Sequence, residues 1–146
     1  MPPIEILLIE DNPGDIRLAL EAFNECKFNV NIQIATDGAE ALDYMYKKGR
    51  FTNAATPDLI LLDLNLPKKS GMEILVKLKG DNELKVIPII ILTTSQAEQD
   101  LMACYKLHAN CFVNKPFEYK AFVKLVEGIG TFWLNTVKLP KVNYMH

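Results

Sequence analysis

The sequence predicts an α/β domain in which helices cover both faces of a doubly wound sheet of five parallel strands. Two runs, residues 59–62 and 89–92, contain only aliphatic side chains, as strands buried on both faces do. Strand-like and helix-like patterns alternate along the whole chain, and right-handed crossovers turn such an alternation into a parallel sheet between helices. Residues 30–34 alternate apolar and polar side chains, which indicates a half-exposed edge strand.

The first half of the chain holds two strand–helix pairs. Residues 4–9 are apolar and end at Glu10-Asp11, after which Asn12-Pro13-Gly14-Asp15 breaks the strand and starts a helix. That helix extends to about residue 27, and Asp15 is expected to cap it. The edge strand follows and stops at Asp37-Gly38. Residues 39–48 then carry apolar side chains at helical spacing, which predicts the second helix.

The second half begins with a polar loop over residues 49–56. The aliphatic run 59–62 ends at Asp63, and Pro67 and Gly71 shape the loop before a helix over residues 73–79. Pro88 precedes the run 89–92, which leads to a helix over residues 96–107. Residues 111–113 form a short fifth strand, and a last helix covers residues 118–135. We therefore expect one domain over residues 1–135 and a tail over residues 136–146.

Composition excludes several classes of function. The chain has 146 residues, of which 49% are apolar and 23% are charged. Its net charge is −2 and no basic stripe stands out in the sequence, which argues against a surface that binds nucleic acid. No apolar run approaches the roughly 18 residues that span a membrane, and the start lacks a signal peptide. The three cysteines form no C-x-x-C pair and predict reduced thiols in a cytoplasmic protein. Two scattered histidines are too few for a zinc site.

Polar side chains gather at the carboxyl ends of four strands. They are Glu10 and Asp11 after the first strand, Asp63 after the third, Thr93 at the fourth and Lys115 at the fifth. In a flavodoxin-like sheet of order 2-1-3-4-5, the switch point lies between strands one and three, where such folds bind ligands. The three acids are therefore expected to converge there, with Thr93 and Lys115 beside them.

This set of residue types points to phosphoryl transfer. Three carboxylates in one crevice repel one another unless a cation joins them, and hard oxygen ligands suit Mg²⁺. A carboxylate is also a nucleophile toward phosphorus and gives an aspartyl phosphate. A lysine and a hydroxyl then stabilise the transferring oxygens.

With these residues the sequence resembles the receiver domains of two-component response regulators over about residues 4–130. The matching motif consists of Glu10-Asp11, Asp63 in Asp-Leu-Asn-Leu-Pro with Gly71 behind it, Thr93, and Lys115-Pro116. The resemblance implies that a histidine kinase phosphorylates Asp63. It also implies an Mg²⁺ site formed by three carboxylates and one backbone carbonyl, namely those of Glu10, Asp11, Asp63 and Asn65.

The same resemblance assigns the remaining site residues. Thr93 is the switch hydroxyl and Lys115 contacts the phosphoryl group. The neighbouring Thr94 is not expected to point at the site. Phe112 stands where the family carries a switch aromatic, although it is equally well read as a core residue. Asp58 opens its strand at the opposite end of the sheet, so we expect no role for it in the site.

Three other functions fit the sequence less well. A haloacid-dehalogenase-type phosphatase needs a second Asp two residues after the nucleophile, and this chain has Asn65 there. An FMN-binding flavodoxin needs backbone donors after the first strand, where this chain is acidic. A receiver that works unphosphorylated would not need the intact set of acids, Thr93 and Lys115.

The C-terminal segment departs from a minimal receiver. Gly128 and Gly130 interrupt a helical pattern at a cost of about 1 kcal/mol each, so close packing against another element is expected. The surplus of apolar residues there predicts a homodimer through the last helix and tail, and the alternative is a tail that folds back on its own domain. The extra length resembles the single-domain regulators of phytochrome-type kinases. We expect no output domain, so the signal would pass by protein contact or by phosphorelay to a histidine phosphotransfer protein.

Overall fold

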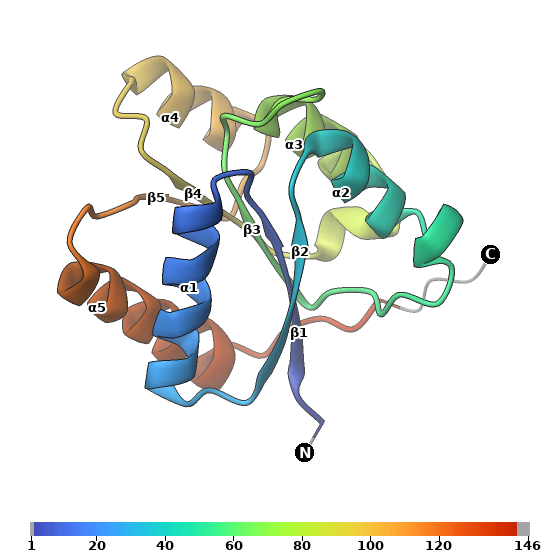
Figure 1. Cartoon of the computed structure of the whole chain (residues 1–146). Coiled ribbons are helices and arrows are strands. Elements are labelled where there is room, and N and C mark those ends of the chain that lie inside the picture. The colour runs from blue at the N-terminus through green and yellow to red at the C-terminus, as the bar shows by residue number, and fades with distance from the viewer. Residues whose placement is uncertain (1, 143–146) are drawn as a thin grey trace.

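Five parallel strands form a single sheet in the computed structural model of the chain, which describes residues 2–142 (Figure 1). Their order is β2-β1-β3-β4-β5, as predicted. The strands are β1 (Ile4–Ile9), β2 (Val30–Ala35), β3 (Leu59–Leu62), β4 (Ile89–Thr93) and β5 (Cys111–Asn114). The strand order reverses between β1 and β3, because β2 lies on one side of β1 and β3 to β5 lie on the other. The crevice at the carboxyl ends of β1 and β3 is therefore the switch point.

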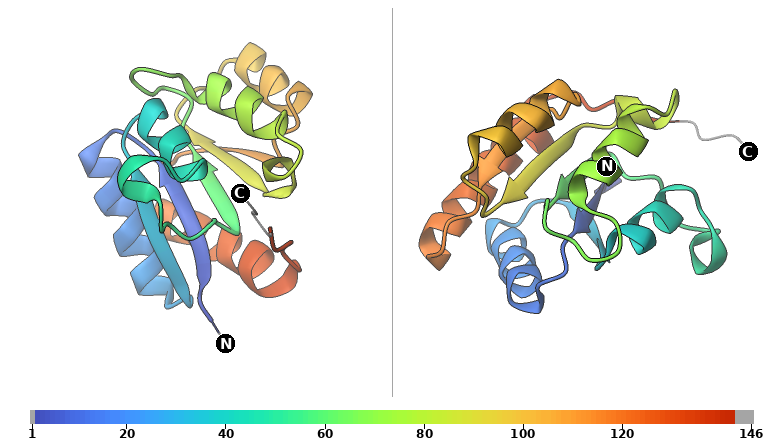
Figure 2. Two further views of the ribbon diagram at one scale, coloured as in Figure 1. Left: turned by 90° about the vertical axis from the view of Figure 1, so that its right-hand side faces the viewer. Right: turned by 90° about the horizontal axis from the view of Figure 1, so that it is seen from above.

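Five α-helices cover the two faces of the sheet (Figure 2). They are α1 (Pro13–Cys26), α2 (Gly38–Met45), α3 (Gly71–Lys79), α4 (Glu98–Lys106) and α5 (Tyr119–Ile129). Helices α1 and α5 pack on one face, and α2, α3 and α4 pack on the other, each with its own apolar cluster. None of these described helices combines the length and the apolar character that a membrane span requires.

Side-chain N-caps begin the first three helices and so set where the loops after β1, β2 and β3 end. The Asn12 side chain accepts from the Asp15 amide, Asp37 from the Glu40 amide and Ser70 from the Glu73 amide. These N-caps satisfy backbone donors that the first helical turn leaves free. Asn12, not Asp15, is therefore the cap of α1, which corrects the assignment made from the sequence.

Burial along the strands follows the sequence pattern. Every residue of β3 and β4 is buried, while β2 alternates partly buried and exposed residues up to Ala35. β5 closes the other edge and is only partly buried. The unbroken aliphatic runs thus occupy the centre of the sheet, and the alternating segment occupies an edge.

The last helix differs from the prediction at its C-terminal end. The sequence pattern predicts one helix over residues 118–135, but α5 ends at Ile129 and a π-helical segment, Gly130–Thr136, continues it. Gly130 lies directly against the Phe28 ring, since a Cβ there would be 2.0 Å from two ring carbons. Gly128 has no atom within 4 Å of such a Cβ. The expected close packing is confirmed for Gly130 and wrong for Gly128.

These two glycines give a matched pair of substitutions. Gly130→Ala should lower the free energy of unfolding by about 2 kcal/mol, because the new methyl group collides with the Phe28 ring. Gly128→Ala should raise it by up to about 1 kcal/mol, because alanine favours the helix and meets no neighbour. Urea unfolding of both variants measures the difference. Changes of the same sign in the two variants would contradict the assigned packing.

The tail folds back on its own domain as far as the structure describes it, which was the alternative left open by the sequence. The Lys141 ammonium lies 2.8 Å from a carboxylate oxygen of Asp58, and Val142 packs against the cluster under α2 and α3. Asp58 is 5% exposed and also accepts from the Glu5 amide at 2.9 Å. Asp58 therefore lies at the start of β3, as expected, and there it contacts the tail. Residues 143–146 of the predicted tail lie outside the described part of the chain.

Candidate functional site

Backbone pairing places three of the predicted site residues at one edge of the sheet. The Glu10 amide donates to the Ala35 carbonyl at 3.0 Å and the Asp63 amide to the Ile9 carbonyl at 3.0 Å. The Lys115 amide donates to the Thr93 carbonyl at 2.8 Å. These bonds continue the strand pairing past the strand ends. The side chains that follow line a pocket of about 410 Å³.

The three predicted acids converge in this pocket. One carboxylate oxygen from each of Glu10, Asp11 and Asp63 lies within 4.8 Å of the others. Glu10 and Asp63 are buried, whereas Asp11 is exposed at the mouth. Three negative charges at this spacing require cationic partners.

Lys115 is the cation that the fold itself provides. Its ammonium group forms ion pairs with Glu10, with Asp15 at 3.0 Å and with Asp63 at 3.3 Å. Burial alone would lower the pKa of Lys115, but the hydrogen bonds and charges of these carboxylates raise it to about 12. The lysine is therefore charged at every physiological pH.

Glu10 is held by more contacts than the other two acids. One of its oxygens accepts from the Asp11 and Asn12 amides at 3.1 and 3.2 Å, and the other binds Lys115. Burial raises the pKa of Glu10 to about 7 against the opposing effect of Lys115, and the charge of Asp63 adds to the rise. Part of the Glu10 population therefore carries a proton at neutral pH.

Asp15 belongs to the site, which reasoning from the sequence did not find. It lies in the first turn of α1, three residues after the Asn12 cap, and its carboxylate reaches Lys115. One local pattern could have indicated this position, because the first turn of α1 follows directly on the acidic end of β1. Its contact with a residue 100 positions away depends on the direction of α1 over the sheet.

The donor atoms of the pocket fit a hard divalent cation. The Asp11 carboxylate forms no ion pair or side-chain hydrogen bond within residues 2–142, and the Asn65 carbonyl accepts no hydrogen bond there. Asn65 lines the pocket, and its amide lies 3.5 Å from an Asp63 oxygen. Carboxylate and carbonyl oxygens with space for water are the ligand set that Mg²⁺ or Mn²⁺ uses.

Thr93 and Thr94 occupy different environments. Thr93 is fully buried, and its hydroxyl oxygen accepts from the Ser95 amide at 3.3 Å. Thr94 is exposed and lines the acidic pocket, which the Thr93 side chain does not. A switch role for Thr93 would require its hydroxyl, which now accepts from the Ser95 amide, to move and donate its proton to a phosphoryl oxygen.

Phe112 lies on β5, partly buried against the apolar cluster that α4 shares. Its amide donates to the Tyr105 hydroxyl at 3.2 Å, and Tyr105 is 47% exposed on α4. This hydrogen bond from the Phe112 backbone to the Tyr105 side chain therefore joins β5 to α4. Sequence reasoning singled out Phe112 alone.

The arrangement can support nucleophilic attack by a carboxylate. Asp63 is next to a fixed ammonium group and to two further carboxylates, and the pocket opens between α1 and the loop after β5. Phe117, 87% exposed, lies on its rim. A phosphoryl donor entering from this side would meet Asp63 with Lys115 beside the oxygens that carry charge.

Comparison with known proteins points in the same direction. Residues 6–127 match the family described as the response regulator receiver domain. The chain is 45% identical over 139 residues to response regulator Rcp1 of Synechocystis sp., and the match covers 95% of each protein.

Solved structures of response regulators are also similar to this chain. The Mn²⁺-bound form of response regulator Rcp1 superposes with a TM-score of 0.90 at 44% identity, covering 95% of this chain and 100% of the other. A phosphorylated cyanobacterial phytochrome response regulator, RcpA, superposes with a TM-score of 0.91 at 44% identity, covering 95% and 99%.

Proposed function

Because the chain belongs to the family of response regulator receiver domains, we propose that it receives a phosphoryl group on Asp63 from a sensor histidine kinase. The observation that carries this proposal is the meeting of Glu10, Asp11 and Asp63 within 4.8 Å beside the buried Lys115 ammonium. Asp63 directly follows the central strand β3 at the switch point, pairs with Lys115 and lines the pocket.

In the proposed reaction, an Asp63 oxygen attacks the phosphorus of a phosphohistidine. A phosphorus–oxygen bond forms, the phosphorus–nitrogen bond breaks, and the imidazole leaves with its electron pair. Lys115, now 3.3 Å from Asp63, stabilises the phosphoryl oxygens as the product forms. The product is an acyl phosphate, and water later hydrolyses it.

We assign Mg²⁺ as the cofactor of this step. Glu10, Asp11, Asp63 and the Asn65 carbonyl would hold it, and it would supply charge neutralisation between the carboxylates and the phosphoryl group. The relative Rcp1, whose solved structure is an Mn²⁺-bound form, supports a divalent cation as the cofactor. Glu10 must lose its proton to serve as a ligand, so its raised pKa makes metal binding weaker as the pH falls below about 7.

The response to phosphorylation is proposed to run from Thr93 to α4 and β5. The Thr93 oxygen now accepts from the Ser95 amide, and the phosphoryl oxygens would give the Thr93 hydroxyl proton an anionic acceptor. A shift of that hydroxyl would reach Phe112 through the neighbouring strand, since Ile91 pairs with Phe112. The contact of the Phe112 amide with Tyr105 would then change the α4 surface.

The proposed partners follow from this chemistry. The phosphoryl donor is a histidine kinase, and the likeness to a phytochrome response regulator supports a phytochrome-type sensor. A histidine phosphotransfer protein is a candidate acceptor for onward relay. All three cysteines are unpaired thiols, which supports a cytoplasmic location.

One experiment tests the phosphoacceptor directly. Incubating the wild type with Mg²⁺ and acetyl phosphate should add the mass of one phosphoryl group, and EDTA should prevent the addition. Asp63→Asn should show no added mass, because it lacks the nucleophilic oxygen. Asp43→Asn, an exposed acid on α2, serves as the control and should be phosphorylated normally. Equal incorporation in Asp63→Asn would refute the assignment.

We also propose a homodimer through the last helix. The support is Phe132, which is 54% exposed beside Trp133 with the two ring centroids 5.5 Å apart. Because the tail folds back on its own domain, the exposed surface around Phe132 would form the contact between the two copies.

Light scattering tests the dimer. The wild type should have the mass of two chains, and Phe132→Ser should have the mass of one, because the exposed ring is removed without disturbing the core. Phe117→Ser, at the rim of the acidic pocket, should leave the dimer intact. A wild type that stays monomeric at all concentrations rules this dimer out.

A further inference from the structure

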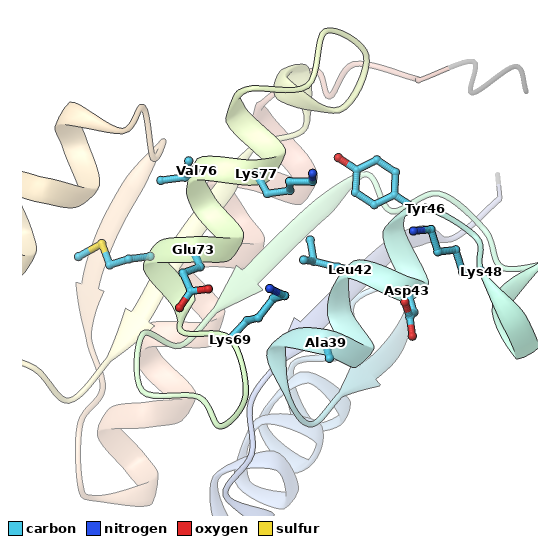
Figure 3. Close-up of a pocket in the computed structure, with 10 residues that line it drawn as sticks. Ala39, Leu42, Asp43, Tyr46, Lys48, Lys69, Glu73, Val76 and Lys77 are labelled. Atoms are coloured by element: carbon cyan, nitrogen blue, oxygen red, sulfur yellow. The ribbon is translucent and has the colours of Figure 1, made fainter.

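A second cavity lies away from the acidic site, between α2 and α3 (Figure 3). Its volume is about 590 Å³, within the range of small-molecule sites in proteins. Its apolar lining comes from both helices and consists of Ala39, Leu42, Tyr46, Met72 and Val76. Val76 is 53% exposed although it is aliphatic, so the cavity presents apolar surface to solvent.

Three lysines surround this apolar surface. The side chains of Lys48, Lys69 and Lys77 point toward the space between the two helices (Figure 3). None of the three forms an ion pair within residues 2–142. The ammonium groups of Lys48 and Lys69 can therefore contact a ligand. So can that of Lys77, whose charge also acts on the Asp81 carboxylate behind Tyr46.

The two acids at the cavity do not cancel this charge. The carboxylates of Asp43 and Glu73 point away from the space that the lysines face (Figure 3). An incoming molecule would thus meet an apolar floor with cations above it, which is complementary to an anion that carries an apolar body.

Tyr46 gives the cavity a fixed aromatic wall. Its hydroxyl donates to Asp81 at 3.1 Å, and the Lys77 ammonium lies 6.0 Å from the centre of its ring. A ring anchored at its polar end cannot easily turn to fill the cavity. The wall is therefore present before a ligand arrives, which lowers the cost of binding.

We infer that the cavity between α2 and α3 binds a small amphipathic anion, with its hydrocarbon part on Leu42, Tyr46 and Val76 and its anionic group between Lys69 and Lys77. An aromatic or branched carboxylate has the required size and charge. This binding does not depend on phosphorylation of Asp63, since no residue of the acidic site lines the cavity.

The probe for this site is 2-naphthoate, titrated into the full chain labelled with ¹⁵N and followed by amide chemical shifts. We expect saturable shifts confined to residues 39–48 and 69–77. The neutral isostere 2-naphthamide should bind at least about tenfold more weakly, because it cannot form charge-assisted contacts with the lysines.

Matched variants locate the contacts. The double variant Lys69→Gln/Lys77→Gln should weaken 2-naphthoate binding by at least about tenfold. The control Lys120→Gln/Lys124→Gln removes two exposed lysines of α5 and should leave it unchanged. Val76→Ser should weaken the acid and the amide alike, because it removes apolar contact rather than charge. All substituted side chains are exposed, so the variants should fold normally.

Three results would overturn the inference. They are the absence of saturable shifts at millimolar 2-naphthoate, shifts centred on another surface such as that around Phe117, and equal affinity of the Lys69→Gln/Lys77→Gln variant and the wild type. The same titration on Asp63→Asn should give the wild-type result, which separates this site from the phosphoacceptor.

Discussion

Replacing Lys115 with glutamine should destabilise the protein by about 3 kcal/mol at pH 8 and slow phosphorylation of Asp63 by about 100-fold. The side chains of Lys115 and Glu10 are 6% and 3% exposed, so water replaces the lost ammonium group only in part. Removing one partner of a buried ion pair leaves the other charge uncompensated, and here three carboxylates lose the same partner.

The pH dependence of this loss identifies its cause. Without Lys115, the pKa of Glu10 in the folded protein should rise above its present value of about 7, which is already above the unfolded value of 4.5. A folded pKa above the unfolded one adds stability at low pH, and this stability disappears as the pH rises through the folded pKa. The deficit of Lys115→Gln should therefore be smaller at pH 6 than at pH 8.

Urea unfolding at the two pH values, with and without Mg²⁺, measures these effects. Mg²⁺ should stabilise Lys115→Gln more than the wild type, because the cation replaces the missing positive charge. Lys120→Gln, an exposed lysine on α5, should change stability by less than about 0.5 kcal/mol. A Lys115→Gln variant as stable as this control would show that Lys115 does not hold the acids together.

Gly71→Ala should have the second large effect, a loss of about 3 kcal/mol together with slower phosphorylation. A Cβ at this position would lie 2.4 Å from the Asp63 carbonyl oxygen and 2.6 Å from the Leu64 Cα. Both are backbone atoms held by the central strand, so the loop of residues 65–70 must move instead. The Gly71 amide donates to the Leu64 carbonyl at 2.9 Å, and this hydrogen bond would be lengthened.

The displaced loop carries Asn65, so Gly71→Ala should also weaken Mg²⁺ binding. Isothermal titration with Mg²⁺ and the rate of labelling by acetyl phosphate measure the two effects. Gly128→Ala makes the same chemical change where a methyl group meets no neighbour, and it should leave both measurements as in the wild type. Normal metal binding by a folded Gly71→Ala would contradict the role given to this loop.

Much of the fold could be predicted because the informative patterns are local. The aliphatic runs of β3 and β4 and the alternation in β2 each identify a strand and its burial within a few residues. The rule that parallel strands share one carboxyl edge then brings Glu10 and Asp63 together without any knowledge of distant contacts.

The features that were missed depend on contacts between distant segments. The contact of Asp15 with Lys115 depends on how α1 lies on the sheet. Gly130 lies close to Phe28, just after the end of α1, whereas a Cβ at Gly128 would meet no neighbour within 4 Å. This difference reflects how the last helix packs against the end of α1. The hydroxyl of Thr93 is engaged by an amide two residues later, a local contact that strand periodicity does not reveal.

The two acids that flank β3 also have a consequence for how the protein is made. Asp58 and Asp63 stand at opposite ends of the central strand, and each is paired with a lysine from the last third of the chain, Lys141 and Lys115 respectively. A ribosome synthesises both acids long before either lysine. The emerging chain therefore carries uncompensated charge at both ends of its central strand, and we expect the sheet to reach its final stability only after synthesis has passed residue 141.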